Sequence, residues 1–238
     1  MRATHDGVPF MAGGDSPHSR ATCFEIVMSS IQIVGRRSSP YTRMTLIFAE
    51  ALQLPYEFVP IYDMTELERD GYAGNPALKL PILRRGAAVL FGTLNICHAL
   101  AETAQCPADI VWPEQLRDDR SRNAQELVWH CLSAQIQIIM GTLVGKLPAD
   151  NVFFVKLRTG MANSLQWLDA HHASTIGALP PRDLSVYEVA LFCLVEHLDW
   201  RGTMSVDAYP ALREFTRTFG ATTPARRTPY QFDTRPQP

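Results

Sequence analysis

A short strand that runs directly into a capped helix constrains the fold of this chain more than any other stretch. Residues 31–34 (Ile-Gln-Ile-Val) alternate as a strand does, and residues 44–52 (Met-Thr-Leu-Ile-Phe-Ala-Glu-Ala-Leu) carry apolar side chains at helical spacing. Pro40 suits the first turn of that helix, and Ser39 suits the cap before it. The N–H groups and the dipole of a helix N-terminus point at one spot, so the junction predicts a small anion site; a serine there can equally be a cap and nothing more.

Three later segments complete a pattern. Residues 75–83 read Asn-Pro-Ala-Leu-Lys-Leu-Pro-Ile-Leu and lie one helix, one strand and one loop after the first junction. A Ser-x-x-Glu capping box at Ser185 predicts the start of another helix. Residues 209–212 (Tyr-Pro-Ala-Leu) and 225–229 (Ala-Arg-Arg-Thr-Pro) follow near the end.

These segments, in this order, resemble the glutathione transferase superfamily over about residues 30–230. The first matches its Ser-Pro-aromatic-x-x-Arg signature, in the version with serine as the active hydroxyl, and the second its Asn-Pro-x-x-Lys-x-Pro-x-Leu signature. The resemblance implies an enzyme of detoxification that adds the glutathione thiolate to a small hydrophobic electrophile. It implies glutathione as co-substrate, no metal, and a homodimer with two separate clefts.

The order of elements predicts an α/β domain followed by an all-α domain. Residues 29–104 read as strand, helix, strand, loop or short helix, strand, strand, helix, and the resemblance makes this a thioredoxin-like, glutathione-binding domain (βαβαββα). We expect a linker at 105–112, an all-helical domain without strands at 113–230, and a tail at 231–238. The first 28 residues predict an irregular N-terminal extension.

Charge and cysteine content narrow the class of protein. A net charge of −2 gives no electrostatic footprint for nucleic acid or an anionic membrane. No apolar run approaches the ~18 residues of a membrane span. The five cysteines are scattered and lack a C-x-x-C pair, which argues against a disulfide framework or a zinc ribbon. We therefore expect a cytoplasmic protein without nucleic-acid or membrane partners.

The resemblance gives Ser39 the catalytic role. A thiol with a pKa of ~8.5 is only about 3% thiolate at pH 7, and lowering that pKa by about two units raises the reactive fraction roughly 25-fold. A hydroxyl at a helix N-terminus can supply much of that stabilisation by donating a hydrogen bond to the sulfur. Ser38 remains a local competitor for the role. A cysteine here would allow mixed disulfides, so its absence argues against thiol transfer. Arg43 is interpreted as an ion-paired structural arginine.

The second motif supplies the expected glutathione contacts. Pro81 resembles the family's cis-proline, a minority state for X-Pro bonds generally. A cis bond would present the backbone of Leu80 to the peptide backbone of glutathione, in the manner of an added strand. Lys79 would lie near the glycine carboxylate of the ligand; the alternative is a solvated surface lysine. Pro40 and Pro81 are expected to act as structural residues beside the site.

The chain departs from the family at Gly92 and Thr93, where relatives usually carry Glu-Ser or Gln-Ser. Thr93 is expected to keep the helix cap and the hydroxyl contact to the γ-glutamyl carboxylate. Gly92 offers no side chain to the γ-glutamyl amine, and losing one charge-assisted contact costs about 1.5–3 kcal/mol, or roughly 10- to 150-fold in affinity. The alternative function is therefore a glutathione transferase-like binding or interaction protein with weak or no glutathione activity.

Overall fold

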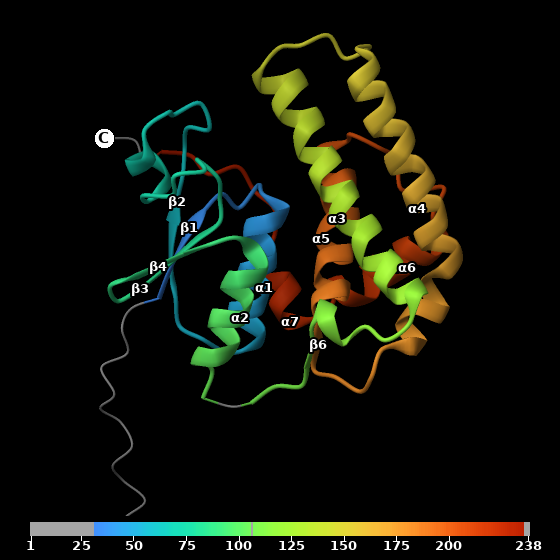
Figure 1. Ribbon diagram of the computed structural model, residues 1–238, viewed down its shortest axis with the longest axis horizontal. Helices are drawn as coiled ribbons and strands as arrows, with labels where there is room; N and C mark the ends of the chain where they lie inside the picture. Colours follow the sequence, from blue (N-terminus) through green and yellow to red (C-terminus); the bar gives the residue numbers. More distant parts are fainter. Residues whose placement is uncertain (1–30, 106, 236–238) are drawn as a thin grey trace, which may run out of the picture.

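The structure is a computed structural model and describes residues 31–105 and 107–235. Its N-terminal domain is built on a mixed sheet of order β2-β1-β3-β4 (Figure 1). Strand β1 (Ile31–Gly35) pairs parallel with β2 (Glu57–Pro60) and antiparallel with β3 (Ile82–Arg85), which pairs antiparallel with β4 (Ala88–Phe91). The extension expected over residues 1–28 lies outside the described residues.

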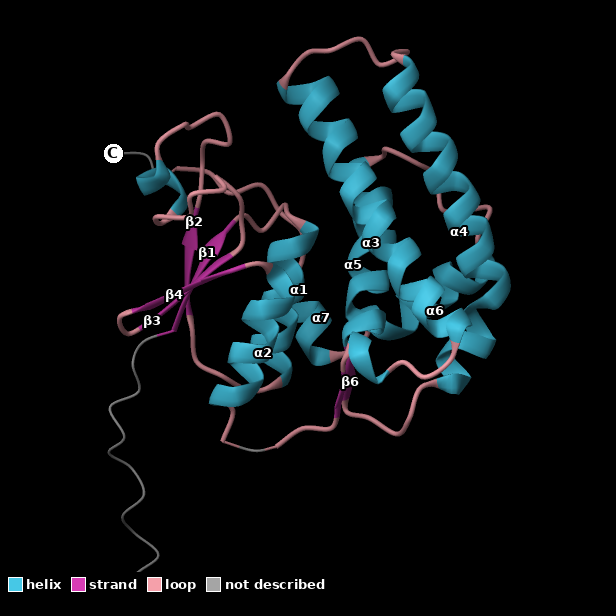
Figure 2. Ribbon diagram, in the orientation of Figure 1, coloured by secondary structure: helices cyan, strands magenta, loops and turns pink. Residues whose placement is uncertain are grey.

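Helices cover the two faces of this sheet unequally. Helices α1 (Pro40–Ala51) and α2 (Thr93–Thr103) lie on the face toward the second domain, as Figure 2 shows, and the short helix η1 (Arg69–Tyr72) packs on the other face. The strands alternate accordingly: Ile33 faces α1 and Val34 faces the η1 side. The predicted thioredoxin-like domain is confirmed, with its second helix reduced to a single short turn.

The second domain is a helical bundle around one buried helix. Its members are α3 (Asp119–Ile139) with a terminal π-turn η3 (Met140–Val144), α4 (Val152–Ala178), α5 (Val186–Arg201), α6 (Pro210–Gly220) and α7 (Thr223–Arg227). Helix α5 is buried along most of its length and packs against α1, α3 and α6. Helix α5 is therefore a closely packed core helix that contacts both domains.

The expectation of a strand-free second domain is wrong in one detail. Strand β5 (Ile110–Val111), just before the short helix η2 (Pro113–Gln115), pairs in parallel with β6 (Leu184–Ser185) before α5. The linker and the α4–α5 loop run side by side there, and Asp183 donates its backbone N–H to the Asp109 carbonyl at 2.8 Å. Such a two-residue pair carries too little pattern to be recognised from sequence.

The helix Asp119–Val144 is long and apolar enough to cross a membrane, with a mean hydropathy of 1.5 over its most apolar window. Length and composition are the only grounds for this, and core helices of globular proteins satisfy both criteria. Here the helix packs against α4 and α5, and its buried residues include Ala124, Val128 and Leu132.

Arg43 joins the two domains. Its side chain leaves α1, is only 2% exposed, and forms an ion pair with Glu196 of α5. The guanidinium also lies 4.8 Å from the ring centre of Phe192 and 4.2 Å from that of Tyr230. The interpretation of Arg43 as an ion-paired structural arginine is confirmed, and its partners all come from the helical domain and the C-terminal segment.

Candidate active site

The register of the sheet brings the predicted site segments to one edge. Val34 of β1 pairs with Ile82 of β3, and Ile82 pairs with Phe91 of β4. Three segments that the sequence assigns to the site lie just beyond this row, at residues 36–39, 80–81 and 92–93, and the chain leaves β2 at the same edge after Pro60. Adjacent strands lie about 4.8 Å apart, so the three segments share an edge about 10 Å wide.

Ser39 caps α1 as expected. The backbone of Ser39 is extended (φ −96°, ψ 127°), and Pro40 is the first helical residue. The Ser39 Oγ accepts a hydrogen bond from the Thr42 N–H at 3.3 Å. Capping uses a lone pair of the hydroxyl and leaves its proton free to donate. Gly35 allows the tight turn, since a Cβ there would stand 2.5 Å from Thr42 Oγ1. Ser39 is 9% exposed, so its hydroxyl lies at the helix start with little access to bulk water.

The turn before Ser39 is held from three sides. The Ser39 N–H donates to the Arg36 carbonyl at 3.0 Å within the turn itself. Asp233 accepts from the Arg37 N–H at 2.8 Å, and the Ser38 carbonyl lies 3.2 Å from His197 Nε2. Sequence reasoning missed Asp233 and His197. Asp233 lies 196 positions from Arg37 and His197 lies 159 positions from Ser38, and contacts over such separations leave no local pattern.

The second motif folds around its asparagine. Asn75 is 3% exposed; its amide donates to the Lys79 carbonyl at 2.6 Å and accepts from the Ala77 N–H at 3.0 Å. This clamp shapes the segment that ends in Leu80 and Pro81, whose peptide bond is cis, as the resemblance implied. The side chain of Lys79 is exposed, so both of its interpretations, ligand contact and solvated lysine, stay open.

The expected cap at Thr93 is wrong. The N-cap of α2 is Gly92, which makes no side-chain cap hydrogen bond, and Thr93 is the first residue of the helix and 8% exposed. Gly92 has φ +87° and ψ 132°, a conformation that side-chain-bearing residues rarely adopt. The glycine is therefore required by the backbone path into α2, although a Cβ there would meet no atom within 4 Å.

The turn contains two arginines, Arg36 and Arg37, and the guanidinium of Arg37 is paired with the Asp233 carboxylate. Arg201 of α5 has its pKa lowered by burial and then by the charge of Arg36. Burial raises the pKa of Tyr41, the aromatic residue of the signature, to about 12, so its phenol stays neutral. An anion at the start of α1 would therefore meet the positive end of the helix dipole, and no phenolate at Tyr41. Among the described residues no cluster of three or more His, Cys, Asp or Glu is placed to hold a metal.

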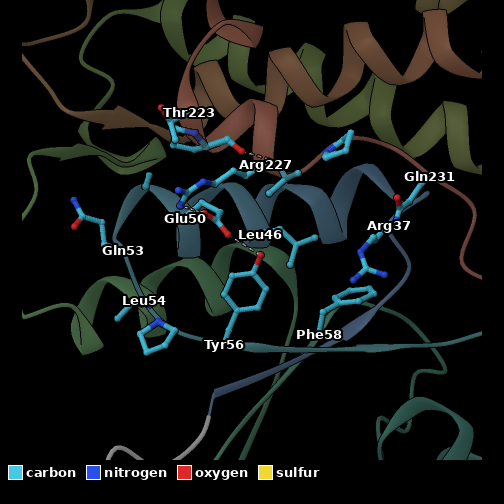
Figure 3. A pocket seen from close by; sticks show the side chains of 15 residues that line it. Arg37, Leu46, Glu50, Gln53, Leu54, Tyr56, Phe58, Thr223, Arg227 and Gln231 are labelled. Carbon is cyan, nitrogen blue, oxygen red and sulfur yellow. Dashed lines mark hydrogen bonds and ion pairs between the residues drawn. The ribbon is translucent and has the colours of Figure 1, made fainter.

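A cavity of about 1130 Å³ lies along the outer side of α1, between β2 and α7 (Figure 3). Glu50 lies at its centre, accepting from the Tyr56 hydroxyl at 3.1 Å and pairing with Arg227 at 3.2 Å. Arg37 lies at its far end, with its guanidinium 4.1 Å from the ring centre of Phe58. None of the predicted glutathione residues lines this cavity, so it is separate from the edge where they meet.

Comparison with known proteins finds a family match over one domain and solved structures of the same fold. The profile of the glutathione S-transferase N-terminal domain matches residues 38–103. A search of curated proteins gave no match. Glutathione S-transferase from Methylobacillus flagellatus KT, solved with GSH, is 17% identical with a TM-score of 0.65, over 84% of this chain and 99% of that one.

Two further solved structures share the fold. Glutathione S-transferase from Methylobacterium radiotolerans JCM 2831, in complex with glutathione sulfonate, is 16% identical with a TM-score of 0.67 and covers 87% of this chain and 99% of its own. Maleylacetoacetate isomerase from Methylobacterium extorquens AM1, with bound malonate and GSH, is 19% identical with a TM-score of 0.63. The match covers 83% of this chain and 95% of that one. Residues 38–103 thus match the glutathione S-transferase N-terminal domain, and the chain as a whole shares the fold of these solved structures.

Proposed function

We propose that this protein is a glutathione transferase that adds the thiolate of glutathione to a hydrophobic electrophile, with Ser39 as the catalytic hydroxyl. The observation that carries the proposal is the state of that hydroxyl. Its oxygen accepts from Thr42 N–H, so its proton is available to an anion at the start of α1. Arg36 and Arg201 add positive potential around the same turn.

The chemistry needs only a stabilised thiolate. The thiol of glutathione loses its proton to solvent, and the Ser39 hydroxyl donates a hydrogen bond to the resulting sulfur anion. The thiolate lone pair then forms a C–S bond to the electrophilic carbon, while a leaving group departs with the electron pair of its own bond. Ser39 forms no covalent bond and needs no deprotonation. Its contribution is electrostatic and acts where the negative charge sits.

The remaining site residues are assigned along the shared edge. An edge about 10 Å wide suits an extended tripeptide. Leu80 would pair through its backbone with the ligand, Thr93 would contact the γ-glutamyl carboxylate, and Lys79 would approach the glycine carboxylate. Solved structures of the same fold contain GSH or glutathione sulfonate, which supports glutathione as the ligand. Isomerase chemistry is a variant of the same thiolate addition, and one of the fold relatives is a maleylacetoacetate isomerase.

The proposal extends to assembly and location. We propose a cytoplasmic homodimer in which the sheet domain of one subunit contacts the first long helices of the other, leaving two separate clefts. The domain limits that we propose are 29–104 and 113–230, with a linker at 105–112 and a tail from 231.

A second candidate function rests on Gly92. With no side chain at this position, nothing there pairs the γ-glutamyl amine, and the backbone conformation discourages a side chain in its place. A glutathione transferase-like binding or interaction protein, with weak or no glutathione activity, would tolerate this loss.

Calorimetric titration with glutathione distinguishes the two candidates. The transferase predicts a saturable heat, together with the ultraviolet absorbance of bound thiolate near pH 7. A titration with S-methylglutathione is the matched control, since this ligand keeps the peptide and cannot form a thiolate. Absence of any heat at millimolar glutathione would exclude the transferase and favour the binding protein.

A further inference from the structure

A hydrogen-bond chain from the helical domain ends on the peptide bond before Ser39. His197 of α5 is 1% exposed, and its Nε2 lies 3.2 Å from the Ser38 carbonyl oxygen. Its Nδ1 lies 3.3 Å from Nε2 of Gln135 on α3, and the same amide nitrogen donates to Thr203 Oγ1 at 2.6 Å. Gln135 is fully buried. The chain therefore runs from the half-buried Thr203 through two buried side chains, Gln135 and His197, to the site turn.

The Ser38 carbonyl fixes the direction of every bond in this chain. A carbonyl oxygen only accepts, so the imidazole must carry its proton on Nε2. A neutral imidazole then accepts at Nδ1, and Gln135 must present its NH₂ group there. Burial, with the charges of Arg201 and Arg43 nearby, lowers the pKa of His197 to about 4, which keeps the ring neutral near pH 7. The orientation of each group follows from its neighbour.

This chain immobilises a single peptide plane. The Ser38 carbonyl and the Ser39 N–H belong to one rigid unit. His197 binds its oxygen, and the Arg36 carbonyl accepts from its N–H at 3.0 Å. With both ends of the plane held, the position of the Ser39 α-carbon is set, and with it the direction in which the hydroxyl leaves the backbone. The His197 imidazole, which holds the carbonyl end, lies on α5, a helix that is buried on most sides.

We infer that His197 is a positioning residue, which holds the Ser38–Ser39 peptide so that the Ser39 hydroxyl points at the glutathione sulfur, and that Gln135 supports it by donating a hydrogen bond to its Nδ1. The inference rests on the proposed function for its catalytic consequence. Small displacements of a catalytic group are costly, since an error of about 1 Å can slow a reaction about 100-fold.

The test compares two amide variants of His197 in the full-length protein. Glutamine places an amide N–H about as far from the backbone as imidazole Nε2, so His197→Gln should keep the bond to Ser38. Asparagine is one methylene shorter, so His197→Asn should lose it. Both variants lose the same aromatic contacts with Trp200 and Tyr230. Backbone amide exchange over residues 36–42, measured without ligand, should rise in the Asn variant and stay near wild type in the Gln variant.

The second readout asks whether the effect passes through Ser39. At saturating glutathione we expect His197→Asn to lower turnover at least about 10-fold and to raise the pKa of the bound thiol, with KM nearly unchanged. In a Ser39→Ala background the same substitution should change turnover less than about twofold. An equal loss in both backgrounds, or Asn and Gln variants that behave alike, would overturn the inference. If His197→Asn does not fold, Gln135→Met replaces it, with Thr203→Val as control.

Failure of the proposed function has a different signature. A wild-type protein that shows neither thiolate absorbance nor heat with glutathione would remove the transferase assignment. Amide exchange over residues 36–42 would then decide the positioning role alone. A rise confined to the Asn variant supports it, and equal exchange in both variants contradicts it.

Discussion

Asp233 accepts two hydrogen bonds from Arg37, one from the backbone N–H and one from the guanidinium, both at 2.8 Å. The Asp233 side chain is 2% exposed, whereas that of Arg37 is 36% exposed. The C-terminal segment is thereby fastened to the turn that precedes Ser39. With Tyr230, whose hydroxyl donates to the Cys193 carbonyl at 2.6 Å, it closes the junction between the domains.

Asp233→Ala should therefore destabilise the protein. It leaves the half-buried Arg37 N–H without its acceptor, which costs about 1 kcal/mol. Urea unfolding measures the change in free energy. Asp207→Ala is the matched control, because its ion pair with Arg213 is exposed and should contribute little. Equal midpoints for the two variants would mean that the C-terminal segment does not secure the turn.

Gly92→Ala and Gly160→Ala should have opposite effects on stability. Gly92 has a positive φ, so alanine should cost about 1 kcal/mol there. Gly160 lies exposed inside α4 with nothing near its missing Cβ, so alanine should stabilise that helix by about 0.5–1 kcal/mol. Thermal unfolding of the two variants and wild type makes the comparison. A stabilised Gly92→Ala would show that the entry into α2 takes another path.

The positive φ also changes what Gly92→Glu should do. Sequence alone allowed a gain in glutathione affinity of about 1–2 kcal/mol from a restored ion pair, or a loss of stability from strain. The strained conformation is the one observed. We now expect the Gly92→Glu variant to be less stable than wild type, and the same strain to limit any gain in its affinity for glutathione. Calorimetry measures the affinity and thermal unfolding measures the stability.

The stability of the protein should fall with acidification in a window set by His197. Its pKa is about 4 in the folded protein and 6.5 when unperturbed, so the unfolded state binds a proton first as pH falls. Its contribution is fully present above about pH 6.5, is lost progressively down to about pH 4, and amounts to about 3 kcal/mol. His172, whose pKa burial also lowers, acts in the same direction.

His197→Gln isolates this contribution, because the variant has no titrating group at the position and keeps His172. Its free energy of unfolding should depend less on pH between about 6.5 and 4 than that of the wild type. Parallel pH profiles for the two proteins would mean that the pKa of His197 is the same in the folded and the unfolded state.

The described cysteines should be inert in the native protein. Burial raises the pKa of Cys131 to about 11 and that of Cys193 to about 12, and it raises the pKa of Cys97 as well. Iodoacetamide at about pH 8 should therefore leave all three unmodified, and denaturant should expose them, as peptide mass spectrometry would show. Native modification of any of them would indicate local opening of the core.

The parts of the fold that sequence could predict are those encoded locally. The strand before Ser39, the Pro40 helix start and the order of elements follow from periodicity, capping and turn residues. The Ser185 cap was also confirmed, although Glu188 does not return to it and instead pairs with Arg182. The capping box was half right, because a competing arginine three residues before the cap offers the carboxylate a charged partner.

The unpredicted features depend on distant contacts or on backbone angles. The bonds from His197 and Asp233 to the site turn cross between domains and leave no periodic trace. Thr93 was expected as a cap because a hydroxyl there suits one, yet the chain enters α2 one residue earlier through a positive-φ glycine. Composition cannot show that angle; only the path of the chain from β4 to α2 does.

The most direct test of the account is the thiolate absorbance and turnover of Ser39→Ala beside Ser38→Ala. The Ser39 hydroxyl should act on the thiolate rather than on the ligand as a whole. We expect Ser39→Ala to abolish most of the thiolate signal and lower turnover at least about 10-fold, with glutathione affinity within about threefold of wild type. Ser38→Ala, whose backbone carbonyl is kept, should change little. An unaffected Ser39→Ala together with an impaired Ser38→Ala would contradict the account and move the role to Ser38.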